Sequence, residues 1–209
     1  MGGDHSVVDA ARVSMDKVAT FYTDDENAKL TKYLAKHEHT SPFNHAFMSF
    51  RVTAPVFVAR QLVKHKFLPW NETSRRYVKT APEFYTPDVW REVAPSVKQG
   101  SLSTPVKNNE EIKQLYSAMM NMLLEAYEAM LSQGVCPEQA RMILPQSMTT
   151  SWIWSGSLGA FAEMCRLRLD PHAQYEARLV ARQIANKAQE LFPVAWPSLL
   201  KDKYDSSTD

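Results

Sequence analysis

The stretch FMSFRVTAPVFVARQLVKHKFLPWNETSRRY, residues 47–77, decides the fold, because the spacing of its apolar residues changes halfway along. Apolar and polar residues alternate over Phe47–Ala54, which predicts a half-buried strand. Pro55 suits the first position of a helix, and the apolar residues of Val56–Phe67 follow a helical period. Pro69 ends that helix, since proline has no backbone N–H to donate. A strand that runs directly into a helix indicates a domain of mixed α and β structure.

Outside this stretch the helical period dominates. A short helix, capped by Asp4 or Ser6, is predicted to run through Ala11. Longer helices are predicted at Asp24–Lys36, at Asn109–Gln133, from Pro137 with a bend at Pro145, at Trp152–Leu169, and from Asp170 to about Leu191.

Two segments show neither period. Trp70–Ser74 is predicted as a loop, and Thr80–Pro105 as a long irregular connection of the kind that often forms lids or partner contacts. The sequence therefore predicts a helix-rich α+β fold: a single domain over residues 1–200 with a small central, mostly antiparallel sheet, followed by a polar tail at 201–209.

Composition narrows the class of protein. At 209 residues the chain can bury a proper core, and its formal net charge of +1 argues against a protein held on nucleic acid by broad electrostatics. Cys136 and Cys165 form no CxxC spacing, so neither a disulfide framework nor a zinc site is predicted. No basic-then-apolar leader and no long apolar run is present. We expect a cytoplasmic protein with reduced thiols.

Cations gather between Arg60 and Tyr77. If the predicted helix reaches Phe67, then Arg60, Gln61, Lys64 and His65 share one helical face, followed by Lys66, Asn71, Glu72, Ser74, Arg75 and Arg76. Arginine suits phosphate because its planar guanidinium donates hydrogen bonds in pairs. Two interpretations remain open on spacing alone: a pocket for a phosphorylated ligand, or a solvated cationic helix face.

Three further groups of residues could take part in binding or catalysis. Arg141 lies in an apolar segment, where it requires a ligand or extends to solvent at the domain edge. Arg168 and His172 flank a predicted helix junction, where side chains of two elements can converge. The segment His37–His45 holds three histidines, but their spacing matches no zinc signature, so a ligand-binding loop is preferred and no metal is predicted.

Together these segments resemble one family, the flavin-dependent thymidylate synthases. KHKFLPWNETSRRY at Lys64–Tyr77 is similar to that family's hallmark RHRxxSxNExSxRY. The resemblance continues, in order along nearly the whole chain, through SVVDAARVS near the start, HTSPFNH at His39–His45, APVFVARQ at Ala54–Gln61, QARMILP at Gln139–Pro145 and LRLDPHAQYE at Leu167–Glu176.

The resemblance implies a homotetramer whose active sites are shared between subunits. It implies conversion of dUMP to dTMP, with NADPH-reduced FAD and with 5,10-methylenetetrahydrofolate as the carbon donor, without a protein nucleophile. It assigns FAD to Ser14, Ser41, Lys64, His65, Lys66, Asn71, Glu72 and His172. It assigns dUMP to Gln61, Glu72, Ser74, Arg75, Arg76, Arg141 and Arg168, with Arg168 as the catalytic residue.

The chain departs from the family pattern in several places. Lys64 and Lys66 replace arginines, and Pro69 stands at the motif's first serine, so no serine nucleophile exists there. Ser157 and Gly159 stand where relatives usually carry an asparagine and an arginine. Family members also usually have one or two strands before the segment that opens this chain. The resemblance therefore implies either a missing sheet edge or an incomplete sequence.

Two alternatives follow from these observations. The lysine and proline departures motivate a pyrimidine nucleotide hydroxymethylase of the same fold, whose product would be heavier by one oxygen. The cations of Lys64–Lys79 motivate a nucleic-acid-binding module, which the near-neutral net charge disfavours.

Overall fold

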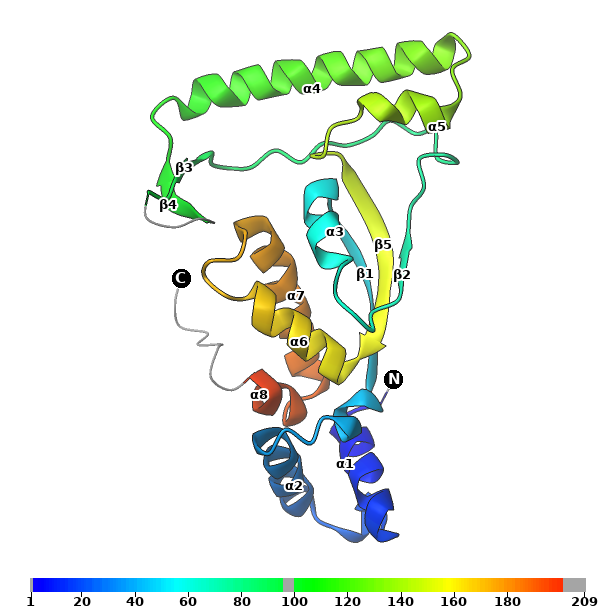
Figure 1. The fold of residues 1–209 in the computed structure, drawn as a ribbon, viewed down its shortest axis with the longest axis vertical. Coiled ribbons are helices and arrows are strands. Elements are labelled where there is room, and N and C mark those ends of the chain that lie inside the picture. Colours follow the sequence, from blue (N-terminus) through cyan, green and yellow to red (C-terminus); the bar gives the residue numbers. More distant parts are fainter. Residues whose placement is uncertain (1, 96–99, 201–209) are drawn as a thin grey trace. The chain divides into compact units, whose positions relative to one another are not determined.

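The computed structural model (Figure 1) describes residues 2–95 and 100–200. These residues group into two compact units. The first unit holds the described residues of segments 1–50, 62–70 and 153–209. The second unit holds those of 51–61 and 71–152. The prediction of a single domain over residues 1–200 stays a prediction, and the predicted tail at 201–209 lies outside the described residues.

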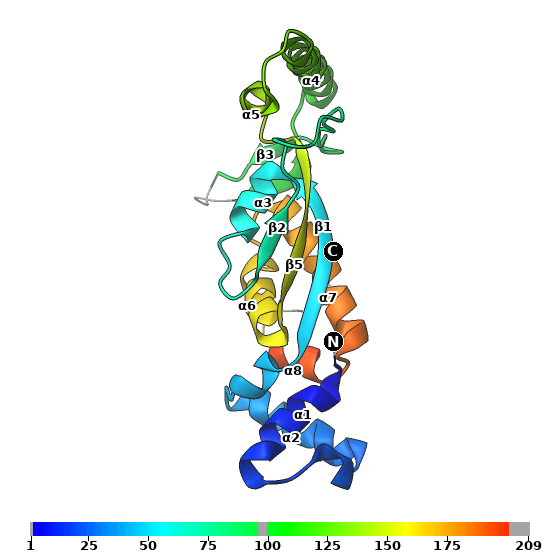
Figure 2. The ribbon, with the colours of Figure 1, turned by 90° about the vertical axis from the view of Figure 1, so that its right-hand side faces the viewer.

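The central sheet has three strands: β1 (Phe47–Pro55), β5 (Thr149–Ser157) and β2 (Trp70–Glu72). Figure 2 shows β5 between β1 and β2, which is their hydrogen-bonded order. Hydroxyl contacts fix the register of the first pair. Ser49 Oγ lies 2.8 Å from Ser155 Oγ, and Thr53 Oγ1 lies 2.7 Å from Ser151 Oγ. One number rises as the other falls, so β1 and β5 are antiparallel, which confirms the predicted kind of sheet.

Strand β1 shows the burial that its sequence predicts. Met48, Val52 and Ala54 are buried, whereas the intervening Arg51 and Thr53 are exposed. This alternation arises because successive side chains of a strand point to opposite faces. The predicted strand at Phe47–Ala54 is therefore confirmed.

Helix α3 (Val56–Leu62) is shorter than predicted. The chain leaves the helix after Leu62, and Phe67 has φ of 61°, which no right-handed helix allows. Burial explains the early end, because Leu68 is buried and its side chain fits where Gly156 of β5 has no side chain. The prediction that Arg60, Gln61, Lys64 and His65 share one helical face was therefore wrong.

The segment from Trp152 begins as a strand and not, as predicted, as a helix. Trp152, Trp154 and Gly156 are buried, while Ile153 between them is exposed, which is the period of a strand. Helix α6 (Leu158–Arg168) starts only at Leu158. The segment forms a strand because it pairs with β1, and its aromatic side chains pack well on the surface of the sheet.

The first unit is built mainly from helices that precede β1 and helices that follow β5 in the chain. They are α1 (Asp4–Arg12), α2 (Asp24–Lys36), α6, α7 (Tyr175–Leu191), α8 (Ala195–Leu200) and the short 3-10 helices η1 (Val13–Met15), η2 (Ala19–Phe21) and η3 (Ser41–Asn44). Phe161 of α6 packs edge-on against Phe50 and Trp154, with ring centres 5.2 and 5.4 Å away. These contacts place α6 on the sheet and so fix where its last residue, Arg168, emerges.

Sequence alone did not reveal α8. The carboxylate of Asp4 accepts hydrogen bonds from Val194 N and Ala195 N at 2.8 and 2.9 Å, so the first turn of α1 caps the start of α8. Helix α7 also begins at Tyr175 rather than at the predicted Asp170.

The second unit contains α4 (Asn109–Ser132), α5 (Pro137–Ala140), η4 (Arg141–Ile143) and an antiparallel hairpin of β3 (Arg91–Val93) and β4 (Ser101–Pro105). The helix predicted from Pro137 with a bend at Pro145 therefore ends at Ala140. The segments predicted as loops contain β2 and this hairpin. In the described residues of these segments the strands are short, so the period-two signal is too brief to see in the sequence.

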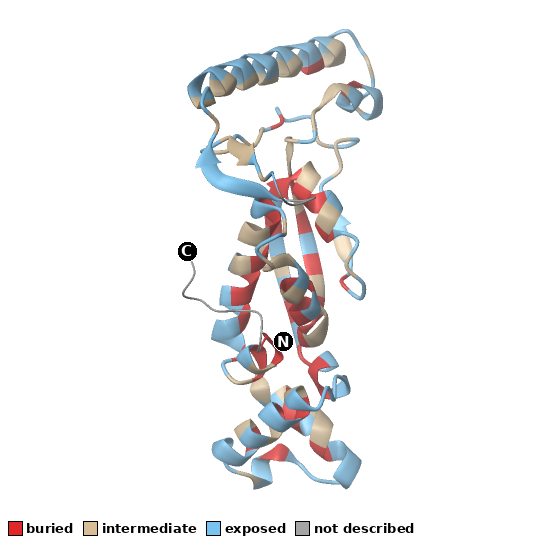
Figure 3. Ribbon diagram, turned by 60° about the vertical axis from the view of Figure 1, so that its left-hand side comes forward, coloured by how far each residue is buried: buried red, intermediate tan, exposed pale blue. Residues whose placement is uncertain are grey.

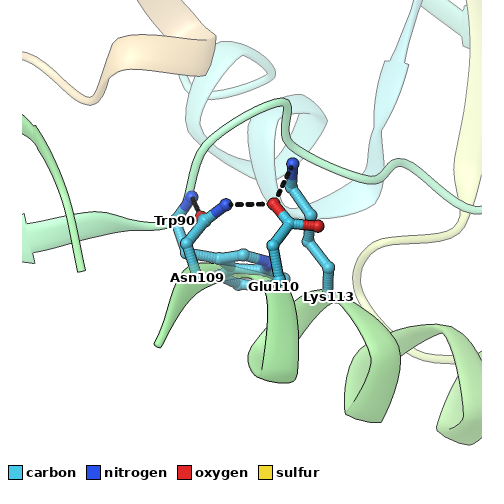
Figure 4. Close-up of polar contacts among 4 residues, drawn as sticks. All are labelled: Trp90, Asn109, Glu110 and Lys113. Atoms are coloured by element: carbon cyan, nitrogen blue, oxygen red, sulfur yellow. Dashed lines mark hydrogen bonds and ion pairs between the residues drawn. The ribbon is translucent and has the colours of Figure 1, made fainter. Parts of the chain in front are cut away.

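Figure 4 shows how the predicted long helix α4 begins. Asn109 Oδ1 accepts a hydrogen bond from Trp90 N at 2.9 Å, and its amide donates to Glu110 at 3.0 Å. Lys113 Nζ lies 3.1 Å from the same carboxylate of Glu110. The first turn is thus tied to the segment before β3.

Most residues of α4 are exposed or of intermediate burial, which Figure 3 shows in pale blue and tan. Tyr127 is its single buried residue in this structure of residues 2–95 and 100–200. Within the same described ranges, no helix combines the length and apolar character needed to cross a membrane.

Candidate functional site

The clearest polar contact among the predicted site residues joins Arg168 to His65. Arg168 ends α6, and Cys165, three residues earlier, anchors that helix in the core. The Nε–H of Arg168 donates to Nε2 of His65 at 3.0 Å. His65 lies in the turn that follows α3, more than a hundred positions away in the chain. The structure therefore brings together two residues from separate predicted groups.

Burial and charge set the protonation of this pair. Desolvation, followed by the positive charge of Arg168, lowers the pKa of His65 below its usual value. Desolvation also lowers the pKa of Arg168, although a guanidinium remains charged at neutral pH. The imidazole is thus kept neutral and accepts the hydrogen bond through Nε2. The guanidinium of Arg168 is a cation in a half-buried position.

An aromatic groove lies nearby in the same unit. Its volume is about 520 Å³, and it is lined by Thr40, Phe43, Asn44, Phe47, Phe67, Ser157, Gly159, Ala160, Glu163, Arg166 and Leu199. Phe67 is 84% exposed, so its ring stands at the groove instead of in the core. Cavities of this size, mostly apolar with a few polar groups, are typical of small-molecule sites.

The two residues noted as departures, Ser157 and Gly159, form part of this groove. Ser157 Oγ donates to Asn44 Oδ1 at 2.9 Å. A Cβ at Gly159 would lie 2.7 Å from the same oxygen, so the missing side chain leaves room for Asn44. Sequence reasoning missed Phe43, Phe47 and Phe67. In the sequence, the only sign that these residues line a site is that each one stands near a polar motif.

The other residues assigned to FAD in the first unit are dispersed. Ser14 donates to Ala11 O at 2.8 Å and lies in η1, and Ser41 begins η3 beside Thr40 of the groove. His172 is exposed, with Nδ1 3.1 Å from Asp170. Lys64 and Lys66 are exposed in the turn that carries His65. Of these, none lines the aromatic groove in the described structure.

The second unit carries most of the residues assigned to dUMP. Glu72 of β2 accepts a hydrogen bond from the buried Thr150 at 2.8 Å. Asn71 precedes it in β2, and Gln61 lies near the end of α3. Thr150 was not predicted from the sequence, although its hydroxyl orients one of the predicted carboxylates.

A small hydroxyl-rich pocket of about 220 Å³ adjoins these residues. It is lined by Thr53, Thr73, Arg75, Val78, Thr80, Ala81, Glu83, Met148, Thr149, Thr150 and Ser151. Arg75 donates to the carbonyl of Thr80, and the backbone N–H of Arg76 donates to Ser74 Oγ at 3.4 Å. Ser74, Arg75 and Arg76 therefore form one turn at this pocket. The segment Arg75–Lys79 is mostly turn.

Arg141 is exposed in η4, and its Nε donates to Glu138 O at 3.4 Å. It does not lie within an apolar helix, because the helix that would have contained it ends at Ala140.

The cysteines and histidines show no reactive cluster. Burial raises the pKa of the Cys165 thiol well above its usual range, and its Sγ donates to Ala181 O at 3.6 Å. Cys136 is exposed and unpaired. His37 and His39 contact the ring of Tyr33, with centroids 4.3 and 6.2 Å away. Among the described residues, no group of three or more potential ligands could hold a metal ion.

Comparisons with known proteins show the family of this chain. Residues 1–194 match the family described as thymidylate synthase complementing protein. A flavin-dependent thymidylate synthase from Thermus thermophilus is 39% identical over 213 residues, covering 100% of this chain and 77% of the relative. One from Thermosipho africanus is 36% identical, covering 98% and 89%.

Solved structures extend the likeness to the fold. The UMP/dUMP methylase PolB from Streptomyces cacaoi, bound with 5-Br dUMP, superposes with a TM-score of 0.82 at 30% identity, covering 95% of this chain and 90% of that one. Bound with 5-Br UMP, PolB gives 0.84 at 28% identity. On sequence and fold together, this chain belongs to the flavin-dependent thymidylate synthases, a family of FAD-dependent methyltransferases.

Proposed function

We propose that the protein converts dUMP to dTMP, with 5,10-methylenetetrahydrofolate as the carbon donor and NADPH as the reductant of FAD. The observation that carries this proposal is the half-buried contact between Arg168 and His65. A fixed cation in a partly desolvated place can stabilise negative charge that develops on a pyrimidine, because it needs no reorganisation during the reaction. We assign that role to Arg168.

The aromatic groove fits the requirements of a flavin. Its phenylalanine rings offer apolar surface to a planar ring system, and Asn44 and Ser157 offer polar atoms at its edge. Bound flavin would supply the two-electron redox chemistry of the reaction. Ser41 and Lys66 are direct chain neighbours of the groove residues Thr40 and Phe67, which supports their assignment to FAD.

For the remaining FAD assignments (Ser14, Lys64, His65, Asn71, Glu72 and His172) the resemblance is the support. Lys64 and Lys66 keep the charge of the family's arginines but donate from a single ammonium, so contacts with a phosphate are not bidentate. We therefore expect weaker flavin retention than arginines at both positions would give.

The phosphate of dUMP is assigned to Arg76 and Arg141, and the rest of the nucleotide to Gln61, Glu72, Ser74 and Arg75. The turn of Ser74–Arg76 at the hydroxyl-rich pocket supports this assignment, since it joins cationic donors with many hydroxyls that can bind a sugar and a phosphate. The hydrogen bond from Thr150 orients Glu72 for the same task.

No thiol supplies a nucleophile in this proposal. A covalent route through C6 of the uracil requires a thiolate, and burial disfavours that form of Cys165. The reaction is placed in the cytoplasm, where two unpaired thiols are stable.

The proposal includes a homotetramer with shared active sites. On α4, Leu115, Met119 and Met122 are 65%, 43% and 60% exposed. Their spacing puts them on one helical face, and a continuous apolar face of this kind marks a surface for association. We assign this face to contact with a second copy of the chain.

Product mass tests the function directly. Purified protein with its flavin is incubated with dUMP, NADPH and methylenetetrahydrofolate, and the nucleotide product is weighed by mass spectrometry. The expected product is dUMP plus one CH₂ unit. A product heavier by one further oxygen would instead establish the hydroxymethylase, and an unchanged nucleotide with salt-dependent binding to DNA or RNA would establish the nucleic-acid-binding module.

A further inference from the structure

A second and larger cavity, here called the basic groove, adjoins the aromatic groove in the first unit. Its volume is about 1100 Å³. Its lining includes Lys32, Tyr33, Lys36, Glu38, His39 and Arg166. Thr40, Phe43, Arg166 and Leu199 also line the aromatic groove, so one ligand can extend from the first cavity into the second.

The basic groove is built from α2, the residues after it, and α8. Helix α2 packs against α8, and both belong to the first unit (Figure 1). A capping box fixes the start of α2: Thr23 Oγ1 accepts from Glu26 N at 3.3 Å, while Glu26 accepts from Thr23 N at 2.8 Å. The helix that carries the groove's lysines is therefore well anchored.

Charge in this groove is predominantly positive. Lys32 and Lys36 stand one helical turn apart, so their side chains lie on the same face. Within residues 2–95 and 100–200, neither lysine forms an ion pair. Arg166 is paired with Glu163 at 3.0 Å, and Glu38 is the one acidic residue of the lining. Two lysines thus remain to receive an anion.

Aromatic surface accompanies this charge. Tyr33 lies between the two lysines in sequence and is 54% exposed. The rings of Tyr33 and His39 are 6.2 Å apart and inclined by only 21°. A small widening, to roughly 7 Å, would admit a third ring in van der Waals contact with both. The groove can therefore bind a ligand that has an aromatic ring next to anionic groups.

We propose that the basic groove binds the p-aminobenzoyl-oligo-γ-glutamate tail of the folate, with Tyr33 against the p-aminobenzoyl ring and Lys32 and Lys36 against the glutamate carboxylates. This inference rests on the proposed function, which requires a folate as carbon donor. It goes beyond that function because it makes tail length a determinant of affinity. Each added glutamate contributes one carboxylate, and the groove's size accommodates several.

The same chemistry, an aromatic ring beside anionic groups, also occurs in the adenosine diphosphate part of FAD. The two sources are distinguished by which ligand loses affinity when the lysines are neutralised. A folate tail predicts a loss for long-tailed folates only, whereas a cofactor diphosphate predicts a loss for FAD.

The test measures binding to the flavin-loaded protein by isothermal titration, with pteroylmonoglutamate and pteroylpentaglutamate as probes. We expect the wild type to bind the pentaglutamate about tenfold more tightly, the size that two partly exposed charge pairs supply. The variant Lys32→Gln/Lys36→Gln should reduce this preference to about twofold or less. Tyr33→Ala should weaken both probes, since both carry the p-aminobenzoyl ring.

A matched control is Lys17→Gln/Lys107→Gln, which removes two exposed positive charges that lie outside the groove. It should keep the pentaglutamate preference. The dissociation constant of FAD, measured by flavin fluorescence, should be the same in all these proteins.

Each contrary outcome overturns the inference in a recognisable way. Equal affinity of the two probes for the wild type would refute the tail site while leaving the proposed function intact. Binding of neither probe would contradict the folate donor, and with it both proposals. A loss of FAD affinity in Lys32→Gln/Lys36→Gln would assign the groove to the cofactor.

Discussion

At the scale of single residues, the contact between Arg168 and His65 is the clearest polar contact among the predicted site residues of the first unit. One hydrogen bond of 3.0 Å joins a cation at a helix end to a neutral imidazole in a turn. Each partner limits what the other can do. Desolvation, together with the charge of Arg168, lowers the pKa of His65 and keeps its imidazole uncharged, and the imidazole orients the guanidinium.

The first prediction concerns Arg168. Arg168→Lys should keep the flavin but reduce kcat for dTMP formation by about 10²- to 10³-fold, the effect of losing one preorganised donor. The reason is that lysine retains charge but lacks the Nε–H that contacts His65. Steady-state kinetics with the flavin spectrum recorded in parallel checks this. Arg178→Lys, at a partly exposed position of α7 that contacts Tyr175, serves as the control, and equal kcat values for the two variants would refute the assigned role.

The second prediction concerns the pH dependence of stability. The pKa of His65 is lowered in the folded protein, chiefly by desolvation, so the unfolded chain binds the proton more readily. Stability from the neutral imidazole is therefore present above about pH 6.5 and lost as pH falls toward the folded-state pKa.

Urea unfolding at about pH 7.5 and about pH 5.5 measures this effect. The free energy of unfolding of the wild type should fall on acidification by more than that of His65→Gln, which has no proton to bind at this position. A parallel decrease in both proteins would show that His65 does not contribute.

At the scale of elements, the meeting of β5 with the turn after α3 builds the aromatic groove. Phe67, with its positive φ, and Leu68 form this turn, and Gly156 of β5 lies beneath it. The turn therefore presents the ring of Phe67 to the groove because Leu68 is buried against the strand.

The third prediction tests this packing. A Cβ at Gly156 would lie 2.3 Å from Leu68 Cδ2 and 3.0 Å from Phe67 O, so one of them must move. Gly156→Ala should lower the free energy of unfolding by about 1–3 kcal/mol and weaken flavin binding. Denaturant titration and flavin fluorescence give the two readouts.

Gly3→Ala is the matched control, because its Cβ would meet only Leu191 O at an ordinary 3.9 Å. It should change neither quantity by more than a few tenths of a kcal/mol. Should Gly156→Ala behave like Gly3→Ala, the turn has more room than the structure shows.

At the scale of the whole molecule, the long helix α4 is largely exposed (Figure 3), and its exposed residues include the apolar Leu115, Met119 and Met122. A monomer would expose this surface to water at a cost proportional to its area. Association of copies of the chain removes that cost, in keeping with the proposed homotetramer.

The fourth prediction follows from this surface. Met119→Lys places a charge in the middle of the face formed with Leu115 and Met122, so it should shift the protein from the tetramer to smaller species. Analytical ultracentrifugation measures the mass. Ser117→Lys adds the same charge on another side of α4 and should leave the mass unchanged. An undiminished mass for Met119→Lys would place the interface elsewhere.

Much of the fold was predictable from sequence because the longest elements carry clear periods. Strand β1 and helices α2 and α4 were found with nearly their observed bounds. Strand β5 was mistaken for a helix because its large aromatic residues are compatible with either period until the partner strand is known. The end of α3 was missed because the turn after it depends on Leu68 packing against β5.

The candidate site, like the fold, was only partly predictable from the sequence. Residue types in the motif Lys64–Tyr77, together with Arg168, led to the family, which the comparisons confirm. The contact of His65 with Arg168, the aromatic groove and the support of Glu72 by Thr150 were not predicted. Each joins segments far apart in the chain, so local patterns carry no sign of them.

By itself, the sequence determined the family, the α+β class and the kinds of side chain available for chemistry, because composition and short-range periods are local properties of a chain. Only the tertiary structure decided which of these side chains meet. A neutral imidazole beside a half-buried guanidinium, and two adjoining grooves of different character, depend on packing between distant segments, since burial and proximity alter charge and pKa only after the chain has folded.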